Sequence, residues 1–357
     1  MKNIKYPWIL AFSVLLLGVA AFILVYHSSI GQCIDFADIP LAEKNRFVKS
    51  IKNKHENRAI AGYFTQGNRI YNSDGLPHQF VGVARPSLEW VQTGENISRE
   101  DFAKMRQLGI NLVRLPLNQQ YYLQSEEYRR LVDRSVEWIN SLGMAVMLDL
   151  HWSDKGGLDP VAEQQVMADK NSLIFWREVA TLYKDNSEVI FELYNEPHDI
   201  SPEVWLNGGP NEDGFEAVGM QTMADLIRNE VGADNLIVVN GINWGYDHQP
   251  LARVEGKNII YGTHPYGQHP GKQIRQDWDA HFGFLSADYP VMITEFGDTS
   301  ACEGVFQKEL VEYANEHSMS WVAWAWYPAD CGFPSLIQDW SGTLNAAGAS
   351  IFPITRE

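Results

Sequence analysis

Short apolar runs recur along the chain from residue 79 onward, and several of the segments between them have the period of an amphipathic helix. The runs cover residues 79–84, 111–118, 145–152, 189–195, 236–244, 258–266, 290–296 and 321–327. Continuous apolar runs that alternate with amphipathic helices are typical of a parallel sheet whose faces are covered by helices. Eight such units predict an α/β fold of the closed (β/α)₈ barrel type.

Helix signals support this alternation. Ser98 and Asp101 form a capping box before an apolar helical pattern, and Gly109 follows as a stop signal. Further helical patterns cover residues 131–142, 173–183, 215–231 and 305–316. An open doubly wound sheet is the alternative, but no strand end carries the glycine-rich GxGxxG phosphate loop typical of that fold.

Composition agrees with one large catalytic domain, which we place at residues 61–357. The chain has 357 residues, of which 45% are hydrophobic, and barrels of roughly 250 residues form single domains. The formal net charge is −17, so phosphates would be repelled and a nucleic-acid partner is excluded. We expect a monomer.

The N-terminal segment has the properties of an export signal. Residues 8–26 carry no charge and would form a helix of about 28 Å, close to the thickness of a bilayer core. Lys2 and Lys5 precede this run, so the positive-inside rule places the N-terminus in the cytoplasm and the rest outside. We favour an uncleaved membrane anchor over a signal peptide for residues 1–31, followed by a polar linker over 32–60. The predicted location is secreted or periplasmic, and any membrane contact is through residues 8–26.

An exported chain also allows disulfides. Cys302 and Cys331 follow the last two apolar runs and could pair across neighbouring loops, which would leave Cys33 over. The alternative is three free thiols. No cluster of Cys and His has the spacing of metal ligands, so we expect neither a metal nor a cofactor.

Two glutamates stand at the ends of apolar runs. Asn195 and Glu196 lie in VIFELYNEPH, and Glu295 lies in PVMITEFGD. Hydrolysis of a glycosidic bond requires one carboxyl group that protonates the leaving oxygen and another that attacks or stabilises the anomeric carbon. These two glutamates can supply both.

Other polar and aromatic residues also lie near the ends of the runs, where a barrel gathers its active site. Indole rings stack on the apolar faces of sugars, while Asn, His, Arg and Tyr bond hydroxyl groups. The strand-end set therefore predicts a carbohydrate site. It comprises Trp90, Arg114, His151, Trp152, Asn195, Glu196, Trp244, His264, Tyr266, Glu295, Trp324 and Trp326.

Over roughly residues 75–330 these motifs resemble glycoside hydrolase family 5 of clan A, and its endoglucanases in particular. Asn-Glu-Pro on the fourth strand and Glu295 on the seventh carry the resemblance. The family's strand-end residues match Trp90 in GVARPSLEW, Arg114 in VRLP, His151 in LDLH, His264 and Tyr266 in THPY, and Trp324 in SWVAW. The chain departs from the family at LDLHW, which lacks a doubled histidine, and at Pro265.

The resemblance implies a retaining hydrolase with Glu196 as acid/base and Glu295 as nucleophile. Asn195 would bind the sugar 2-hydroxyl, and Tyr266 and Arg114 would position Glu295. His151, His264 and the tryptophans Trp90, Trp244 and Trp324 would bind sugar. We further expect Glu196 to hold a proton, because a nearby ionised Glu295 opposes a second charge.

The leading substrate is a β-1,4-glucan such as cellulose, and a mannan or another β-glucan is the alternative. A carbohydrate-binding pseudoenzyme is a third reading, although it would normally have lost Asn195 or one glutamate.

Overall fold

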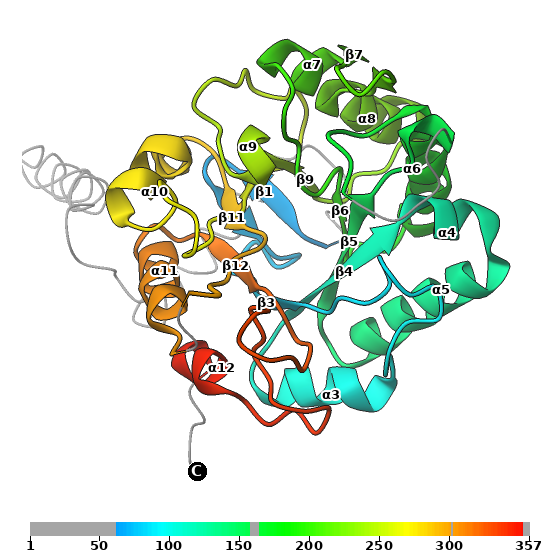
Figure 1. Cartoon of the computed structure of the whole chain (residues 1–357). Coiled ribbons are helices and arrows are strands. Elements are labelled where there is room, and N and C mark those ends of the chain that lie inside the picture. Colours follow the sequence, from blue (N-terminus) through cyan, green and yellow to red (C-terminus); the bar gives the residue numbers. More distant parts are fainter. Residues whose placement is uncertain (1–61, 158–163, 301–302, 353–357) are drawn as a thin grey trace, which may run out of the picture. The chain divides into compact units, whose positions relative to one another are not determined.

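A closed parallel barrel forms the centre of the molecule (Figure 1). The computed structural model describes residues 62–157, 164–300 and 303–352. Around the barrel the strands follow the order β10-β11-β12-β3-β4-β5-β6-β9. They are β3 (Val81–Ala84), β4 (Leu112–Asn118), β5 (Ala145–Trp152), β6 (Val189–Glu192), β9 (Ile237–Asn240), β10 (Ile259–Thr263), β11 (Val291–Ile293) and β12 (Ser320–Ala323). Seven of them lie within the apolar runs that predicted strands and β12 begins one residue before its run, so the predicted barrel is confirmed.

Alternation along each strand separates two cores. Val146, Leu148 and Leu150 of β5 point outward to the helices, whereas Ala145 and Met147 point into the barrel. The lower barrel interior is an apolar cluster to which most strands contribute one inward residue. Its members include Leu112, Ile190, Val238, Ile260, Met292 and Val322. Beyond this layer, toward the carboxyl ends of the strands, the inward side chains are polar.

Helices surround the barrel (Figure 1). The α-helices are α3 (Arg99–Gln107), α4 (Gln119–Gln124), α5 (Glu126–Ser141), α6 (Lys170–Tyr183), α7 (Pro202–Asn207), α8 (Met220–Asp225), α9 (Ile242–Gly245), α10 (Arg275–His281), α11 (Val305–Glu316) and α12 (Ala346–Ile351). The remaining helical turns are η2 (Lys155–Gly157), η4 (Gly283–Ala287) and the π-helix η3 (Leu226–Val231). In α3, the Ser98 side chain accepts a hydrogen bond from the Asp101 backbone N–H, as its capping sequence predicted.

The predicted helix over 215–231 is partly wrong. Glu216–Ala217 is a strand, β8, that pairs with β7 (Gly209–Pro210), and the helix begins only at Met220. A side chain at Gly219 would lie 2.3 Å from the Leu206 carbonyl oxygen, so the chain runs closely past α7 before it turns into α8. A backbone approach of this kind has no periodic signal in the sequence.

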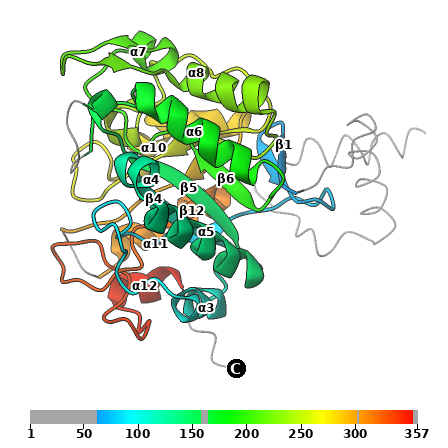
Figure 2. The ribbon, with the colours of Figure 1, turned by 90° about the vertical axis from the view of Figure 1, so that its right-hand side faces the viewer.

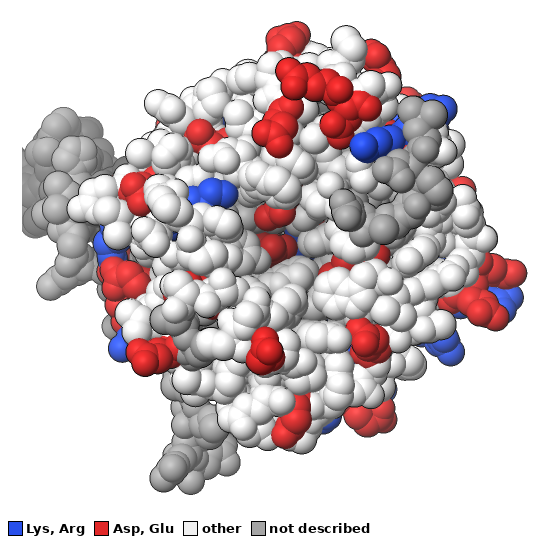
Figure 3. Space-filling model, in the orientation of Figure 1, with Lys and Arg blue, Asp and Glu red and all other residues white. Residues whose placement is uncertain are grey.

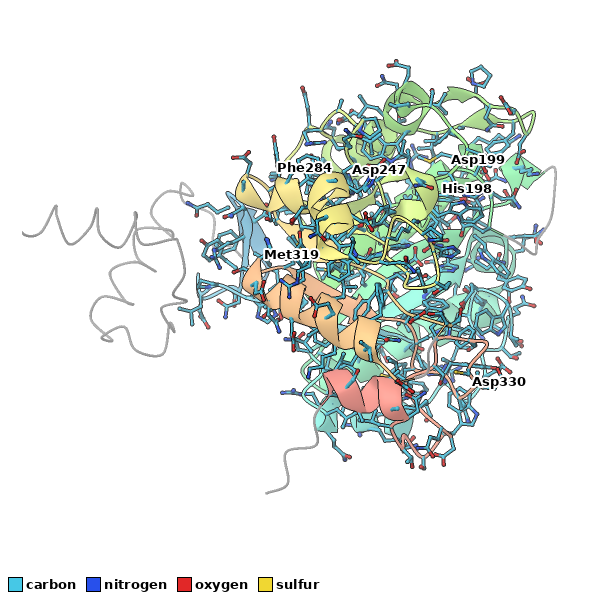
Figure 4. The ribbon with its side chains drawn as sticks, turned by 60° about the vertical axis from the view of Figure 1, so that its left-hand side comes forward. His198, Asp199, Asp247, Phe284, Met319 and Asp330 are labelled. Carbon is cyan, nitrogen blue, oxygen red and sulfur yellow. The ribbon has the colours of Figure 1, made fainter. Side chains whose placement is uncertain are left out.

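The two ends of the barrel differ. His198 and Asp330 follow β6 and β12 and lie on one side in Figure 4, whereas Met319, just before β12, and Phe284 lie on the other. The hairpin of β1 (Phe64–Gln66) and β2 (Arg69–Tyr71) lies at the second end (Figure 2) and is tied there by the Thr65 N–H, which donates to Asn258 Oδ1 over 3.0 Å. The amino end of the strands is thus covered, and the carboxyl end is left for a site.

Several predictions fall outside the described residues. The anchor or signal peptide at 1–31 and the linker at 32–60 are among them, as are Cys33 and Cys302. Cys331 is disulfide-bonded, so three free thiols are excluded, while its pairing with Cys302 stays a prediction. Within residues 62–157, 164–300 and 303–352, no helix combines the length and apolar character that a bilayer crossing needs.

Candidate active site

Glu196 and Glu295 lie together at the carboxyl end of the barrel, just after β6 and β11. One carboxylate oxygen of each lies within 4.8 Å of the other. Both side chains line a pocket of about 660 Å³, and Figure 3 shows a hollow with acidic side chains on its floor at the centre of this face. The predicted pair is therefore brought together within reach of one small molecule.

Arg114 holds the Glu295 side of the site from below. Its Nη1 donates to Glu295 Oε2 and its Nε to Glu192 Oε2, both over 2.6 Å. Its Nη2 donates to Asn195 Oδ1 over 2.6 Å and lies 2.9 Å from Asp149 Oδ2. Burial opposes the charge of Arg114, but the surrounding carboxylates outweigh it and raise the Arg114 pKa well above its usual value.

The contacts of Arg114 agree with its expected role in positioning Glu295, and its full burial leaves it no surface for direct contact with a substrate. The Nε, Nη1 and Nη2 atoms of its guanidinium all bond protein groups, and its role is to position Glu295. Tyr266 completes this support from above, because its hydroxyl donates to Glu295 Oε1 over 2.5 Å. Burial, together with the adjacent Glu295, raises the Tyr266 pKa well above its usual value and keeps the phenol a donor.

Glu196 forms a dyad with His264, whose Nδ1 lies 3.0 Å from Glu196 Oε1. The opposite nitrogen, Nε2, lies 3.0 Å from Thr294 Oγ1, and that hydroxyl donates to Asn240 Oδ1 over 2.9 Å. The Asn240 amide nitrogen in turn donates to Glu192 Oε1 over 2.6 Å. Since the Thr294 proton is already committed to Asn240, Nε2 must carry the proton of its own bond.

The dyad therefore holds one further proton between His264 Nδ1 and Glu196 Oε1. Burial opposes the charge of His264, but Glu295, Glu192 and Glu196 outweigh it and raise the His264 pKa to about 9. Burial alone would raise the Glu196 pKa, yet the bond and charge of His264 lower it overall. The expectation that Glu196 itself holds the proton in the free site is wrong, because that expectation left His264 out.

A buried polar layer links these groups and was missed by the sequence reasoning. Glu192, Asp149, Asn240 and Thr294 are all fully buried below the two glutamates. Asp149 and Glu192 are paired in register on β5 and β6. The signal was present in the alternation: each of the four lies two residues beyond an inward apolar residue of its strand.

His151 and Asn195 form one wall of the site. His151 Nδ1 lies 2.6 Å from Asp149 Oδ2, and the His151 ring stacks on Trp324 at 5.6 Å and 10°. The Asn195 Nδ2 donates to Gln164 Oε1 over 2.8 Å and lies 3.5 Å from His151 Nε2. Burial lowers the His151 pKa, so this ring is neutral and can bond a hydroxyl.

On the Glu196 side, Trp244 is the exposed aromatic residue of the pocket, at 44%. Its indole stacks on His198 at 3.7 Å and 9°, and its φ of +61° is unusual for a large side chain. The preceding residue, Asn243, also has a positive φ, and its carbonyl accepts a bond from Lys272 Nζ over 2.9 Å. Neither His198 nor Lys272 was predicted from the sequence.

The other strand-end tryptophans differ in exposure. Trp90 and Trp152 are half-buried at the rim. Trp326 is fully buried and donates to Asp101 Oδ1 of α3 over 3.0 Å, so its prediction as a site residue is wrong and its role is structural.

The residues Glu196, His264 and Glu295 also form a group whose ligand atoms could surround a cation. The donors already facing them do not favour that use. Arg114 and Tyr266 bond Glu295, and a protonated His264 faces Glu196. This chemistry fits proton transfer between charged groups better than metal binding.

Residues 68–330 match the family model described as cellulase, glycosyl hydrolase family 5. The chain belongs to glycoside hydrolase family 5. Among the relatives of this chain, Endoglucanase N of Pectobacterium atrosepticum is 26% identical over 272 residues, covering 73% of this chain and 56% of the relative. Endoglucanase C of Evansella cellulosilytica is 26% identical over 296 residues, covering 72% and 34%. The chain thus spans about a third to a little over half of these relatives.

Solved structures agree on the barrel fold. The native β-glucanase SdGluc5_26A of Saccharophagus degradans superimposes with a TM-score of 0.66 at 23% identity, covering 82% of this chain and 92% of that one. The same β-glucanase in complex with cellotetraose gives 0.64 at 24% identity, covering 89% and 97%.

Proposed function

We propose that the chain is a retaining endo-β-glucanase that cleaves β-1,4-glucosidic bonds in cellulose or a related β-glucan. The observation that carries this proposal is the geometry of Glu196 and Glu295. Their nearest oxygens lie within 4.8 Å, and retaining glycosidases hold their carboxyl groups about 5–5.5 Å apart whereas inverting enzymes need about 6.5–9.5 Å. Too little space remains for a water molecule that attacks from the opposite face.

In the first step, Glu295 attacks the anomeric carbon and the bond to the leaving oxygen breaks. Arg114 and Tyr266 each bond one oxygen of Glu295, which fixes the direction of attack. The leaving oxygen takes the proton that the dyad holds between His264 and Glu196. Glu196 delivers it because its carboxyl group is partly exposed in the pocket, whereas His264 is fully buried.

In the second step, water attacks the anomeric carbon, and the ester bond to Glu295 breaks. Glu196 accepts the water proton, which restores the dyad for the next turnover. Two displacements at one carbon leave its configuration unchanged. We assign the sugar 2-hydroxyl to Asn195, because Arg114 fixes its amide oxygen and its amide nitrogen, which donates to Gln164 Oε1 here, is the group left to act as a donor to substrate.

A β-1,4-glucan is the substrate that the comparisons favour, because the curated relatives are named endoglucanases. A β-mannan and other β-glucans stay alternatives, because the same catalytic pair acts on them. A reducing-sugar assay over cellulose, mannan, xyloglucan and laminarin separates these substrates. Highest activity on mannan would contradict the glucan assignment but leave the hydrolase assignment intact.

A binding-only pseudoenzyme is disfavoured by the complete set of chemical groups. Glu196, Glu295 and Asn195 are all present, and each is held by the partners that catalysis needs.

Two variants test the catalytic roles. Glu196→Ala should lose most activity on natural glucans but still react with aryl glycosides that have good leaving groups, because these need little protonation. Its slow second step should accelerate with azide and give a β-glycosyl azide. Glu295→Ala should fail on both substrates and, with azide and an activated β-glycoside, give the α-azide.

Product anomers read by NMR decide the outcome. The same anomer from both variants, or near-normal hydrolysis of a natural glucan by either one, would overturn the assignment.

We also propose that the catalytic domain works as a monomer outside the cytoplasm, bound to the membrane through residues 8–26. The charge pattern of the N-terminal sequence supports the location. N-terminal sequencing of the mature protein separates an anchor from a cleaved signal peptide. Recovery of the full-length chain in the soluble cytosolic fraction would contradict both.

A further inference from the structure

The rim of the site has two chemically different halves. The pocket that Glu196 and Glu295 both line extends from them over residues that follow β9 and β10, among them Trp244 and Lys272, and this is the first half. The other half follows β12 and β3 and is aromatic. If Glu196 protonates the leaving group, the leaving sugar occupies the first half. The sugars that stay attached to Glu295 must then extend over the second.

Aromatic rings lead away from the catalytic centre along this second half. Trp324, which stacks on His151, is followed by Phe333 at 6.1 Å and then Tyr327 at 5.7 Å. Trp90 comes last, 5.6 Å from Tyr327 and at 88° to it. Phe333, Tyr327 and Trp90 are half-buried, so one face or edge of each remains accessible.

Glu95 joins the last two rings. Its Oε2 accepts one hydrogen bond from Trp90 Nε1 and another from the Tyr327 hydroxyl, each over 3.0 Å. The rings come from loops after different strands, β3 and β12. A single carboxylate oxygen therefore fixes their perpendicular arrangement.

The Glu95 backbone is itself fixed. Its N–H donates to Ser87 Oγ over 3.0 Å, and its carbonyl accepts from Arg85 Nη2 over 2.6 Å. Arg85 is fully buried, pairs with Asp101 of α3 and lies 4.5 Å over the Trp340 ring. The carboxylate is thus held on a rigid base, which a residue that orients others requires.

The second oxygen, Oε1, accepts no hydrogen bond from any described residue and is not among the fully buried polar atoms that lack a partner. It stands beside two accessible rings, where a hydroxyl group of a bound sugar would need an acceptor. Two perpendicular rings with a carboxylate between them match a pyranose, which offers an apolar face and an equatorial rim of hydroxyls.

We propose that Glu95 is a specificity-determining residue, which orients Trp90 and Tyr327 as two walls of a sugar subsite on the Glu295 side and offers Oε1 to a hydroxyl group there. This inference rests on the proposed function for the direction in which the chain of sugars runs. The resulting subsite favours substrates long enough to reach it.

Kinetics on aryl β-glycosides of glucose, cellobiose, cellotriose and cellotetraose test the proposal. In the unmodified enzyme, kcat/KM should rise with glycoside length when the chain becomes long enough for one of its sugars to reach Trp90. Glu95→Ala should reduce that rise about ten-fold, as expected for the loss of charged hydrogen bonds. Glu95→Gln should lose less, because its amide oxygen can still accept from both rings. Glu178→Ala, which removes an exposed glutamate on α6, is the matched control.

A double-mutant cycle with Trp90→Ala separates orientation from general damage. Because one of the roles of Glu95 is to orient Trp90, the two substitutions together should cost clearly less than the sum of their separate effects. Equal losses on short and long glycosides in Glu95→Ala, or fully additive effects in the cycle, would overturn the proposal.

Calorimetry on the Glu295→Gln variant distinguishes the subsite proposal from the proposed function. It measures the affinity for each oligosaccharide of the series cellobiose, cellotriose and cellotetraose without hydrolysis. Failure of the unmodified enzyme to hydrolyse any of the glycosides would contradict the proposed function. If Glu95→Ala, added to this variant, removes the increase of affinity with oligosaccharide length, the subsite is supported even without hydrolysis. No such loss would contradict the subsite even in an active hydrolase.

Discussion

At the level of single residues, the close approach of Glu196 and Glu295 could be predicted because both glutamates follow recognisable strands. The groups that determine the protonation of these glutamates could not be predicted from the sequence. His264 was expected to bind a hydroxyl, yet both of its nitrogens are engaged by Glu196 and Thr294. Glu192 and Asn240 stood inside apolar runs, and their partners come from other strands. A one-dimensional pattern indicates that an inward position is polar but not which partner meets it.

The proton relay gives a pH prediction. Because the His264 pKa is raised to about 9, the dyad keeps its proton below that pH and loses it above, so kcat/KM on a natural glucan should fall near pH 9. Thr294→Val removes the acceptor for the Nε2 proton and should lower this pKa. The alkaline limb of the pH profile should then move to lower pH.

Thr294→Ser is the matched control, since it keeps the hydroxyl and should keep the limb near that of the unmodified enzyme. An aryl glycoside with a very good leaving group should show a weaker shift, because it needs little protonation. Coincident alkaline limbs for the valine and serine variants would contradict the relay.

At the level of elements, the long strands and amphipathic helices were predictable, but the short elements were not. The helix α11 begins and ends where its pattern predicted, at Val305 and Glu316. In contrast, α7, β7 and β8 are held by backbone contacts such as the one at Gly219, which leave no periodic trace. The helix α5 begins at Glu126, before its apolar pattern, because Ser125 caps it.

Two residues at the start of α3, its N-cap Ser98 and Asp101 in its first turn, have different roles. Ser98 caps the helix, whereas Asp101 accepts from Arg85 over 2.6 Å and from Trp326 over 3.0 Å in a fully buried setting. Asp101→Ala should cost about 3–5 kcal/mol, because it leaves the Arg85 charge buried without a partner. Ser98→Ala should cost only about 1 kcal/mol.

Urea unfolding of both variants measures the difference. Asp101→Asn should lie between the two, as it keeps an acceptor for Trp326 but not the charge. Equal free energies of unfolding for Asp101→Ala and Ser98→Ala would show that the buried ion pair contributes little.

At the level of the whole molecule, eight apolar runs were sufficient for the barrel, since the order of strands and helices leaves few alternatives. The hairpin β1–β2 was not predicted. Its strands have only three residues each, and they are held by the barrel end rather than by a pattern of their own.

The disulfide of Cys331 gives a prediction on global stability. Cys331→Ser should lower the free energy of unfolding by about 2–4 kcal/mol, because the cross-link restricts the unfolded chain. Thermal unfolding should show a lower Tm, and a reductant should lower the Tm of the unmodified protein but not that of the variant. An unchanged Tm in reductant would contradict this role, and peptide mapping tests whether Cys302 is the partner.

Arg114 reaches Asp149 on β5, Glu192 on β6 and Glu295 just after β11, and β5 and β6 lie on the other side of β4 from β11 in the barrel order. Its donors are satisfied only while the register of those strands is intact. Heating that loosens the barrel by a fraction of an ångström should therefore release Glu295 before any helix melts. Catalytic activity should therefore be lost at a lower temperature than the secondary structure. Inactivation on heating should precede the loss of far-UV circular dichroism and be reversed on cooling.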